Sequence, residues 1–300
     1  MIRILGTLFA ALAGLAFGSF LNVCLSRWPA GESVVQPRSH CRSCGRTLAW
    51  WENVPLISWL ALRGHCRTCR AAISWRYPLV ELAVAVLWAT TIWRFMPELL
   101  DPLLPTTVIV CNLLPVLGML IFFWMLIALM MLDASHFWLP NSITLPGIIL
   151  GVVFELVKSI LNALSPVHGT VSRSELIKSE TGHAAMTALL AILGAAGLIL
   201  LIRWIYWLIR RREGIGMGDA KLMAMLGAWL GLSGALLSFA IGVVLGAIFA
   251  LVVLALPRRG GEPWALTKLP LGTFLCIGGI VSALWGPQII AAYLRLNGWS

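Results

Sequence analysis

Long apolar runs separated by polar segments dominate this sequence. Several runs exceed the roughly 18 residues that indicate a membrane-spanning helix. The expected spans are Ile4–Val23, Tyr77–Trp93, Val108–Leu132, Ile143–Leu164, His183–Ile209 and Leu271–Tyr293. The pattern therefore predicts an all-α polytopic membrane protein that lies in a lipid bilayer.

The apolar run from Asp219 to Leu256 is too long for one span. It contains 38 residues. A single helix of that length would extend about 57 Å, whereas the apolar core of a bilayer is about 30 Å thick. The segment Gly231-Leu-Ser-Gly234 offers a break. We therefore expect two helices here, the first of them short, which gives about eight transmembrane helices in all.

Composition and charge agree with a membrane protein. Hydrophobic residues make up 60% of the chain, charged residues 11%, and the mean hydropathy is +0.91. The formal net charge is +10. Such an excess can indicate nucleic-acid binding in a soluble protein, but here the cations cluster in a few loops, as the positive-inside rule describes. We expect no nucleic-acid partner, basic loops in the cytoplasm, and both termini on the other face.

The first apolar run admits a second interpretation, because Arg3 could begin a cleaved signal peptide. The run is longer than the apolar core of most signal peptides, and a very basic loop follows it. We therefore favour a retained first transmembrane helix over residues 1–23.

The one large polar segment covers residues 24–76, with eight arginines and two glutamates. It contains two Cys-x-x-Cys pairs separated by 21 residues, Cys41 with Cys44 and Cys66 with Cys69. In a reducing cytoplasm this spacing favours a structural four-cysteine zinc site over disulfides. A redox dithiol is the alternative. His40 or His65, each just before a pair, could replace a ligand. We predict a small cytoplasmic zinc-binding loop domain.

Aspartate is rare in the chain and lies near the ends of apolar runs. The three aspartates are Asp101, in a short loop between prolines, Asp133, after the run Val108–Leu132, and Asp219. An acid at the edge of an apolar segment is costly to desolvate and is a candidate functional residue. Asp133 and Asp219 are expected at the same cytoplasmic face. Two carboxylates brought together there can share a proton and activate water.

Four further residues are candidate substrate contacts. Gly216 and Gly218 would let an extended peptide lie against the backbone beside Asp219, and a plain flexible turn between helices is the alternative. Lys221 could bias the charge of the aspartate pair, bind a lipid headgroup, or simply extend to the membrane surface. Glu81 lies one turn inside a predicted span and could contact substrate or pair with a nearby arginine.

Seven stretches together make the chain resemble the prepilin peptidases, the type 4 prepilin leader peptidase and N-methyltransferase family of GxGD-type aspartic membrane proteases. They are Gly18-Ser-Phe-Leu-Asn-Val23 with Arg27 and Pro29, Pro37-Arg-Ser-His-Cys-Arg-Ser-Cys44, Trp51-Glu-Asn-Val-Pro-Leu-Ile-Ser58, Cys66-Arg-Thr-Cys69, Tyr77-Pro-Leu-Val-Glu81, Asp133 through Gly147, and Gly216-Met-Gly-Asp-Ala-Lys221. The GxGD motif is weak alone, but the set is highly specific in this order and topology.

The resemblance implies a transmembrane aspartic peptidase domain over residues 77–300, in a bacterial inner membrane, with Asp133 and Asp219 as the catalytic pair. Many relatives have an aspartate where this chain has Asn141, so that position cannot supply an acid here. The implied activity is cleavage of the basic leader of type IV prepilins or type II secretion pseudopilins at the cytoplasmic face. It also implies methylation of the new N-terminus by S-adenosylmethionine, for which Glu52, Asn53 and Glu81 are candidates.

Two other functions remain open at this stage. A proton-coupled transporter could use the same intramembrane aspartates, although the sequence shows no convincing repeat. A zinc-regulated membrane scaffold would make the aspartate pair purely structural.

Overall fold

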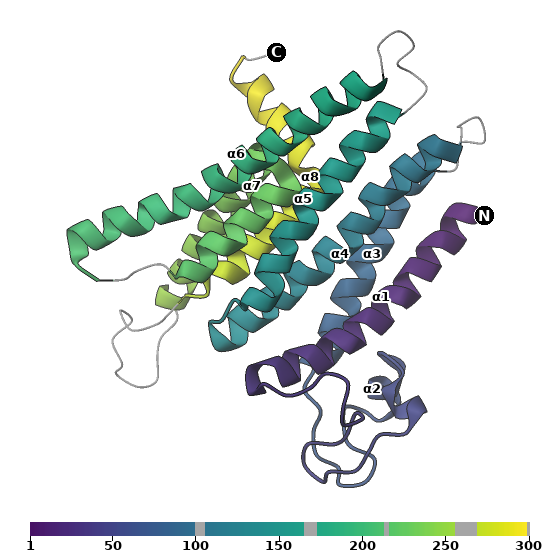
Figure 1. The fold of residues 1–300 in the computed structure, drawn as a ribbon. Coiled ribbons are helices and arrows are strands. Elements are labelled where there is room, and N and C mark those ends of the chain that lie inside the picture. The colour runs from purple at the N-terminus through teal and green to yellow at the C-terminus, as the bar shows by residue number, and fades with distance from the viewer. Residues whose placement is uncertain (100–105, 165–172, 213–215, 256–268, 299–300) are drawn as a thin grey trace. The chain divides into compact units, whose positions relative to one another are not determined.

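The computed structural model of the chain describes residues 1–99, 106–164, 173–212, 216–255 and 269–298. Its elements are α1 (Ile2–Arg27), η1 (Trp28–Ala30), η2 (Trp50–Asn53), α2 (Ile57–Ala61), α3 (Arg76–Leu99), α4 (Thr106–His136), α5 (Asn141–Leu164), α6 (Arg173–Arg210), α7 (Met217–Ala255) and α8 (Leu271–Leu296), as Figure 1 shows. Seven of these helices are long and apolar enough to cross a membrane. The predicted all-α membrane fold is confirmed.

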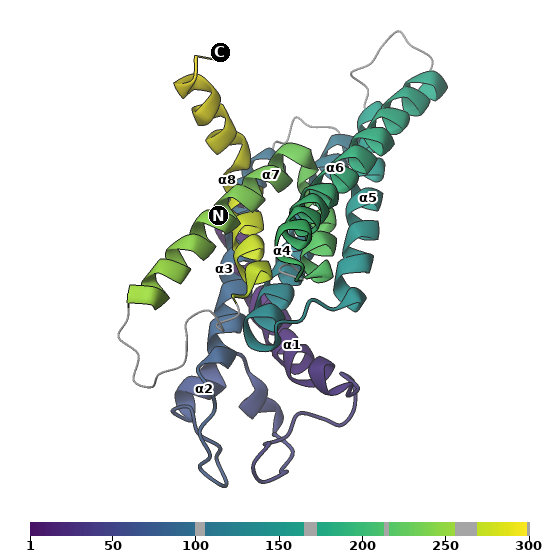
Figure 2. The same cartoon turned by 90° about the vertical axis from the view of Figure 1, so that its left-hand side faces the viewer.

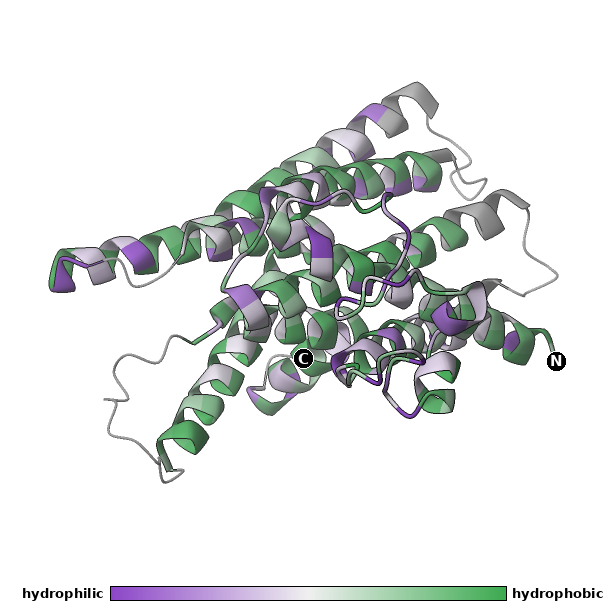
Figure 3. Ribbon diagram, turned by 90° about the horizontal axis from the view of Figure 1, so that it is seen from below, coloured by the Kyte–Doolittle hydropathy of each residue, from purple (hydrophilic) through white to green (hydrophobic). Residues whose placement is uncertain are grey.

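Hydrophobic residues dominate the long helices, and hydrophilic residues gather in the loops and at helix ends (Figure 3). The chain divides into two compact units, Met1–Ala128 and Leu129–Ser300, which we describe separately. The predicted domain boundaries at residues 23 and 76 separate segments by their expected function and not by how compactly they pack. These boundaries stay a prediction.

In the first unit, α1 and α3 pack antiparallel through small residues. A methyl group added to Gly14 would lie 2.7 Å from Cα of Ala85, and one added to Gly18 would lie 2.6 Å from Cα of Glu81. One turn further on, Asn22 Nδ2 donates to the carbonyl oxygen of Tyr77 at 2.9 Å. Spacing of small residues by four lets two backbones approach this closely in a membrane, where the hydrophobic effect does not drive helix association.

The first part of α4 joins this pair through two tryptophans. The indole N–H of Trp88 donates to the carbonyl oxygen of Leu120 at 3.0 Å, and that of Trp124 donates to the carbonyl oxygen of Phe17 at 3.1 Å. Trp88 is buried, and a buried indole N–H needs a partner. Together with the more exposed Trp124 bond, this bond holds the first part of α4 against α3 and α1.

In the second unit, α7 is two helical arms joined at Gly231, as the sequence predicted. Gly231 has φ 69° and ψ 177°, a non-helical conformation that essentially only glycine adopts. The arms are Met217–Leu230 and Leu232–Ala255. Counted separately, they bring the seven long helices to the eight that were expected, with a first arm about 21 Å long.

The two arms run in opposite directions, as their contacts with α8 show. The second arm packs antiparallel to α8, because Gly234 lies against Ser282, Ser238 against Gly278, and Gly242 against Leu275. The first arm packs parallel to α8, because Asp219 interacts electrostatically with Cys276, while Trp229 lines a cavity with Ser282 and Gly286. Figure 2 shows α7 turning back on itself accordingly.

Replacing Gly231 with alanine tests the turn. No atom lies within 4 Å of the position that a Cβ would occupy, so only backbone strain opposes the change, by about 1–3 kcal/mol. We expect a lower thermal unfolding midpoint in a membrane mimetic. Gly197→Ala is the matched control, because Gly197 also has open space around it but lies within helix α6, where alanine is favoured by about 1 kcal/mol. Equal midpoints for the two variants would contradict the assignment.

Candidate functional site

Asp133 lies in the last turn of α4 with its side chain buried, the whole residue being 6% exposed. An acid is unfavourable at a helix C-terminus, where the macrodipole is negative. The first turn of α8 compensates: Thr273 donates to Asp133 Oδ2 twice, from its backbone N–H at 2.6 Å and from Oγ1 at 3.0 Å. The carboxylate therefore sits at the N-terminus of α8, where helix N–H groups favour negative charge.

Asp219 lies in the first turn of α7 and is 8% exposed. Its carboxylate accepts a hydrogen bond from the backbone N–H of Gly216, the residue before the first helical residue, Met217. An acidic side chain three residues into a helix that reaches back to the N-cap N–H forms half of a capping box. Asp219 is thus also held by a helix N-terminus.

The structure brings Asp133 and Asp219 together. Their carboxylates are close enough for their charges to interact, and Leu139 links their surroundings. A methyl group on Gly218 would lie 3.1 Å from Leu139 Cβ, and one on Gly272 would lie 3.0 Å from Leu139 Cδ1 and 3.0 Å from Asp133 Cγ. Two adjacent, largely desolvated carboxylates can divide the roles of general acid and general base between them. Asp101 lies outside the described residues.

Two of the other residues predicted beside Asp219, Lys221 and Gly218, have structural partners. Lys221 Nζ donates to Asn141 Oδ1 at 2.7 Å, which ties the second turn of α7 to the first residue of α5. Gly218 is covered by Leu139, so its lack of a side chain has a packing reason that does not require substrate. Gly216 is exposed and has room beside it. Their roles toward substrate stay predictions.

Thr273 was not found by sequence reasoning. It lies 140 residues from Asp133, and a threonine at the start of an apolar run is too common to single out. The only local signal is Pro270, the N-cap of α8, which marks where helix N–H groups become available.

The four loop cysteines in the first unit form a cluster that could hold a metal ion. The sulfur atoms of Cys41, Cys44, Cys66 and Cys69 all lie within 4.8 Å of one another, and Cys41 Sγ is 3.7 Å from Cys69 Sγ. A tetrahedral zinc ion with Zn–S distances of about 2.3 Å requires sulfur atoms about 3.8 Å apart. The cluster therefore fits such an ion.

The two cysteine pairs adopt the same turn, 25 residues apart. Cys41 N–H donates to the carbonyl oxygen of Arg46, and Cys66 N–H to that of Ala71. The residue after each pair has positive φ, 70° at Gly45 and 57° at Arg70. Backbone N–H groups point at the first sulfur of each pair, and those of Cys69 and Thr68 lower the pKa of Cys66 to about 6. This favours the thiolate form of Cys66, the form that metals bind, whereas burial and the hydrogen bonds from Cys66 and Cys41 raise the pKa of the neighbouring Cys69 to about 11.

Neither predicted histidine joins the cluster. His40 Nδ1 lies 3.1 Å from the carbonyl oxygen of Arg38, and His65 Nδ1 lies 2.6 Å from that of Arg63. Within the part of the chain that is described, the metal-ligand group contains only the four cysteines.

Glu52, a predicted methylation-site residue, uses both oxygens of its carboxylate for hydrogen bonds within the loop. Its side chain is 1% exposed, and Oε1 accepts from Arg46 Nη2 at 2.7 Å while Oε2 accepts from the backbone N–H of Ala49 at 2.8 Å. The Arg46 hydrogen bond, helped by that of Ala49, holds the pKa of Glu52 below its usual range.

Glu81 also has internal partners. It is 7% exposed on α3, and Oε2 accepts from the backbone N–H of Leu56 at 2.8 Å. Leu56 has φ 58°, a conformation that strains a leucine, so this bond holds a strained turn at the start of α2.

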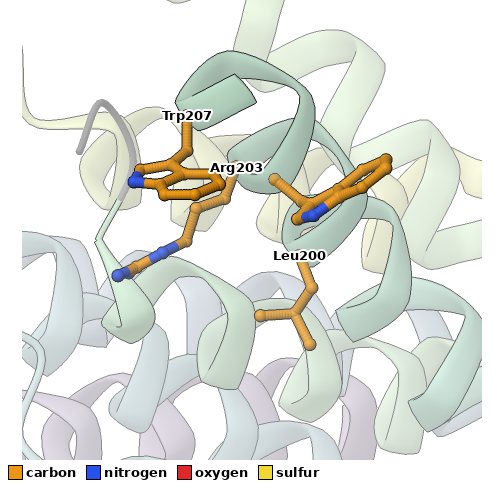
Figure 4. Close-up of a pocket in the computed structure, with 4 residues that line it drawn as sticks. Leu200, Arg203 and Trp207 are labelled. Carbon is orange, nitrogen blue, oxygen red and sulfur yellow. The ribbon is translucent and has the colours of Figure 1, made fainter. Parts of the chain in front are cut away.

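Two hollows in the second unit do not involve the aspartates. One, of about 320 Å³, is lined by Leu200, Arg203, Trp204 and Trp207 along α6 (Figure 4). The other, of about 490 Å³, lies between α7 and α8 beside the Gly231 turn.

The fold and the paired acids define a class, the polytopic helical membrane proteins with a buried aspartate pair formed by separate helices. Within that class, comparison identifies the family. Residues 12–95 match the bacterial peptidase A24 N-terminal domain, and residues 120–251 match the type IV leader peptidase family. The chain belongs to the type IV leader peptidase family.

Similar proteins from several bacteria are named prepilin leader peptidase/N-methyltransferase. The protein from Stutzerimonas stutzeri is 34% identical over 96% of this chain and 93% of its own length, and that from Pseudomonas aeruginosa is 33% identical with the same coverage. The Myxococcus xanthus protein is 35% identical over 85% of this chain and 66% of its own length. No solved structure matches the chain.

Proposed function

We propose that this protein hydrolyses the leader of type IV prepilins with Asp133 and Asp219 as its catalytic pair. The observation that carries the proposal is the arrangement of two buried, interacting carboxylates, each bonded to the N–H of a helix start. The name shared by the relatives supplies the substrate class, and pseudopilins of type II secretion share that chemistry. No finding supports the transporter alternative.

The reaction needs no covalent intermediate. One carboxylate, deprotonated, removes a proton from water as the water attacks the scissile carbonyl. The other, protonated, donates to the carbonyl oxygen. As the tetrahedral intermediate collapses, the first carboxyl gives the proton that it took from water to the leaving amine, and the second recovers a proton from a hydroxyl group of the intermediate. The two groups titrate as a pair, so the acid and base roles belong to the pair. Thr273, which bonds Asp133 through both N–H and Oγ1, fixes the orientation of that carboxylate.

We place this chemistry at the cytoplasmic edge of the bacterial inner membrane. The basic loops support that orientation through the positive-inside rule. Because both the leader and these loops are basic, charge does not attract the substrate. The apolar segment of the prepilin, entering from the bilayer, supplies most of the binding free energy.

Methylation of the new N-terminus, with S-adenosylmethionine as donor, is the second proposed activity. It rests on the names of the relatives. Of its candidate residues, Glu52 and Glu81 have internal partners, so their contribution would be to hold the loop in shape, and Asn53 is exposed beside them.

Replacing either aspartate with asparagine should abolish cleavage. The amide cannot exchange a proton, so we expect loss of at least about a hundredfold in the rate of leader removal. The measurement is mass spectrometry of a prepilin incubated with each purified variant. Asp101→Asn is the matched control and should cleave normally. Normal cleavage by Asp133→Asn or Asp219→Asn would rule out the mechanism.

Thr273→Val should lower kcat/KM for cleavage by roughly ten- to a hundredfold, because a hydrogen bond to a charged group contributes roughly 1.5–3 kcal/mol. Thr273→Ser restores the hydroxyl and should recover most of the activity. Ser282→Ala is the control, since Ser282 is also a buried hydroxyl on α8 but donates to the carbonyl oxygen of Gly234. Equal losses in the valine and serine variants would show that Oγ1 does not act on Asp133.

The cysteine cluster should hold about one zinc ion per chain, measured by elemental analysis of purified protein. Cys41→Ser or Cys69→Ser should lose the metal, because three thiolates and a weak hydroxyl bind it far less tightly. Cys24→Ala, which alters a buried cysteine outside the cluster, should retain it. A folded, metal-free wild-type protein would contradict the zinc assignment.

A further inference from the structure

The short helix α2 presents its apolar side outward. Ile57 is 67% exposed and Leu60 is 66% exposed, and at a spacing of three they share one helix face. The residues between them turn inward: Ser58 Oγ donates to the carbonyl oxygen of Val54, and Trp59 Nε1 donates to that of Ile73. A helix surrounded by water would have the reverse polarity, so this face is suited to an apolar environment.

The position of α2 along the membrane helices is fixed by Glu81. Glu81 lies five residues inside the candidate span Arg76–Phe95, about 7.5 Å along the helix axis. Its carboxylate accepts a hydrogen bond from the backbone N–H of Leu56 at 2.8 Å, and α2 begins at the next residue. The start of α2 is therefore held level with the end of a membrane span, beside α3 (Figure 1, Figure 2).

The charge of the surrounding loop indicates which surface covers this face. Residues 24–76 carry eight arginines and two glutamates, a formal charge of +6, which stays positive even with a zinc tetrathiolate of charge about −2. Trp75, 68% exposed, lies immediately before α3, in a position typical of tryptophan at a membrane interface. Apolar anchors, interfacial tryptophan and surrounding cations fit an anionic lipid surface.

We propose that α2 is an interfacial anchor, which inserts Ile57 and Leu60 into the headgroup region of the bilayer and docks the four-cysteine loop on anionic lipids. The Glu81–Leu56 hydrogen bond sets its depth and maintains the strained turn that leads into it. This proposal is independent of the peptidase activity, because it concerns only the first unit and the bilayer.

Hydroxyl-radical footprinting of the wild-type chain, one copy per lipid nanodisc, tests the proposal. Val35 is the internal standard, because it is an aliphatic loop residue of similar exposure, 79%, and is remote in sequence from α2. We expect Ile57 and Leu60 to be oxidised several-fold less than Val35, with greater protection when the nanodisc contains phosphatidylglycerol than when it contains phosphatidylcholine alone. Equal oxidation of all three residues would overturn the proposal.

Two variants separate anchoring from folding. Ile57→Glu/Leu60→Glu should keep its zinc but lose the protection of residues 57–61 from amide hydrogen exchange in nanodiscs, whereas Val35→Glu should keep both. Glu81→Gln, whose amide oxygen can still accept from Leu56, should retain the protection, and Glu81→Leu should lose it. Unchanged exchange in Ile57→Glu/Leu60→Glu would show that lipid contact does not protect α2 and would overturn the proposal. Unchanged exchange in Glu81→Leu would show that the Glu81–Leu56 hydrogen bond does not set the depth of α2.

Discussion

The burial of two carboxylates at the ends of apolar helices is the constraint on which the second unit depends. A desolvated acid needs donors, and in a membrane the unpaired N–H groups of a helix start are the most available ones. Asp133 takes those of α8, through Thr273, and Asp219 takes that of Gly216 at the start of α7. Both helices must therefore begin where α4 ends.

This requirement explains the shape of α7. Its first arm begins at the aspartate pair and runs away from it, yet α8 must start beside Asp133. The chain has to return, and the second arm brings it back. The reversal at Gly231 is thus a consequence of placing one helix N-terminus beside each of the two carboxylates. Small residues let the returning arm pack tightly on α8, and Ser238 and Ser282 both donate to the carbonyl oxygen of Gly234 near the turn, at 2.7 and 2.9 Å.

Features encoded in local pattern were predictable, and features that depend on long-range contacts were not. The spans follow from hydropathy, and the break at Gly231 follows from length and glycine. The cysteine cluster follows from spacing. Thr273 and the Lys221–Asn141 bond could not be predicted, since each pairs residues 80 or more positions apart. Glu81 was identified as unusual, but its partner is a backbone N–H, which no sequence pattern reveals.

On the proposed function, a basic protein cuts a basic leader, and the bilayer offers a way to offset the repulsion between them. If α2 holds the four-cysteine loop on anionic lipid, the positive charge of the loop is neutralised by headgroups rather than directed at the substrate. The leader of a prepilin, whose apolar segment already lies in the same membrane, is drawn to the same headgroups. Lipid then acts as the shared counter-charge for enzyme and substrate, and their encounter occurs in two dimensions. On this argument, the net positive charge of residues 24–76 serves to orient the loop on the membrane rather than to recognise the leader, although Arg46 is paired within the loop with Glu52.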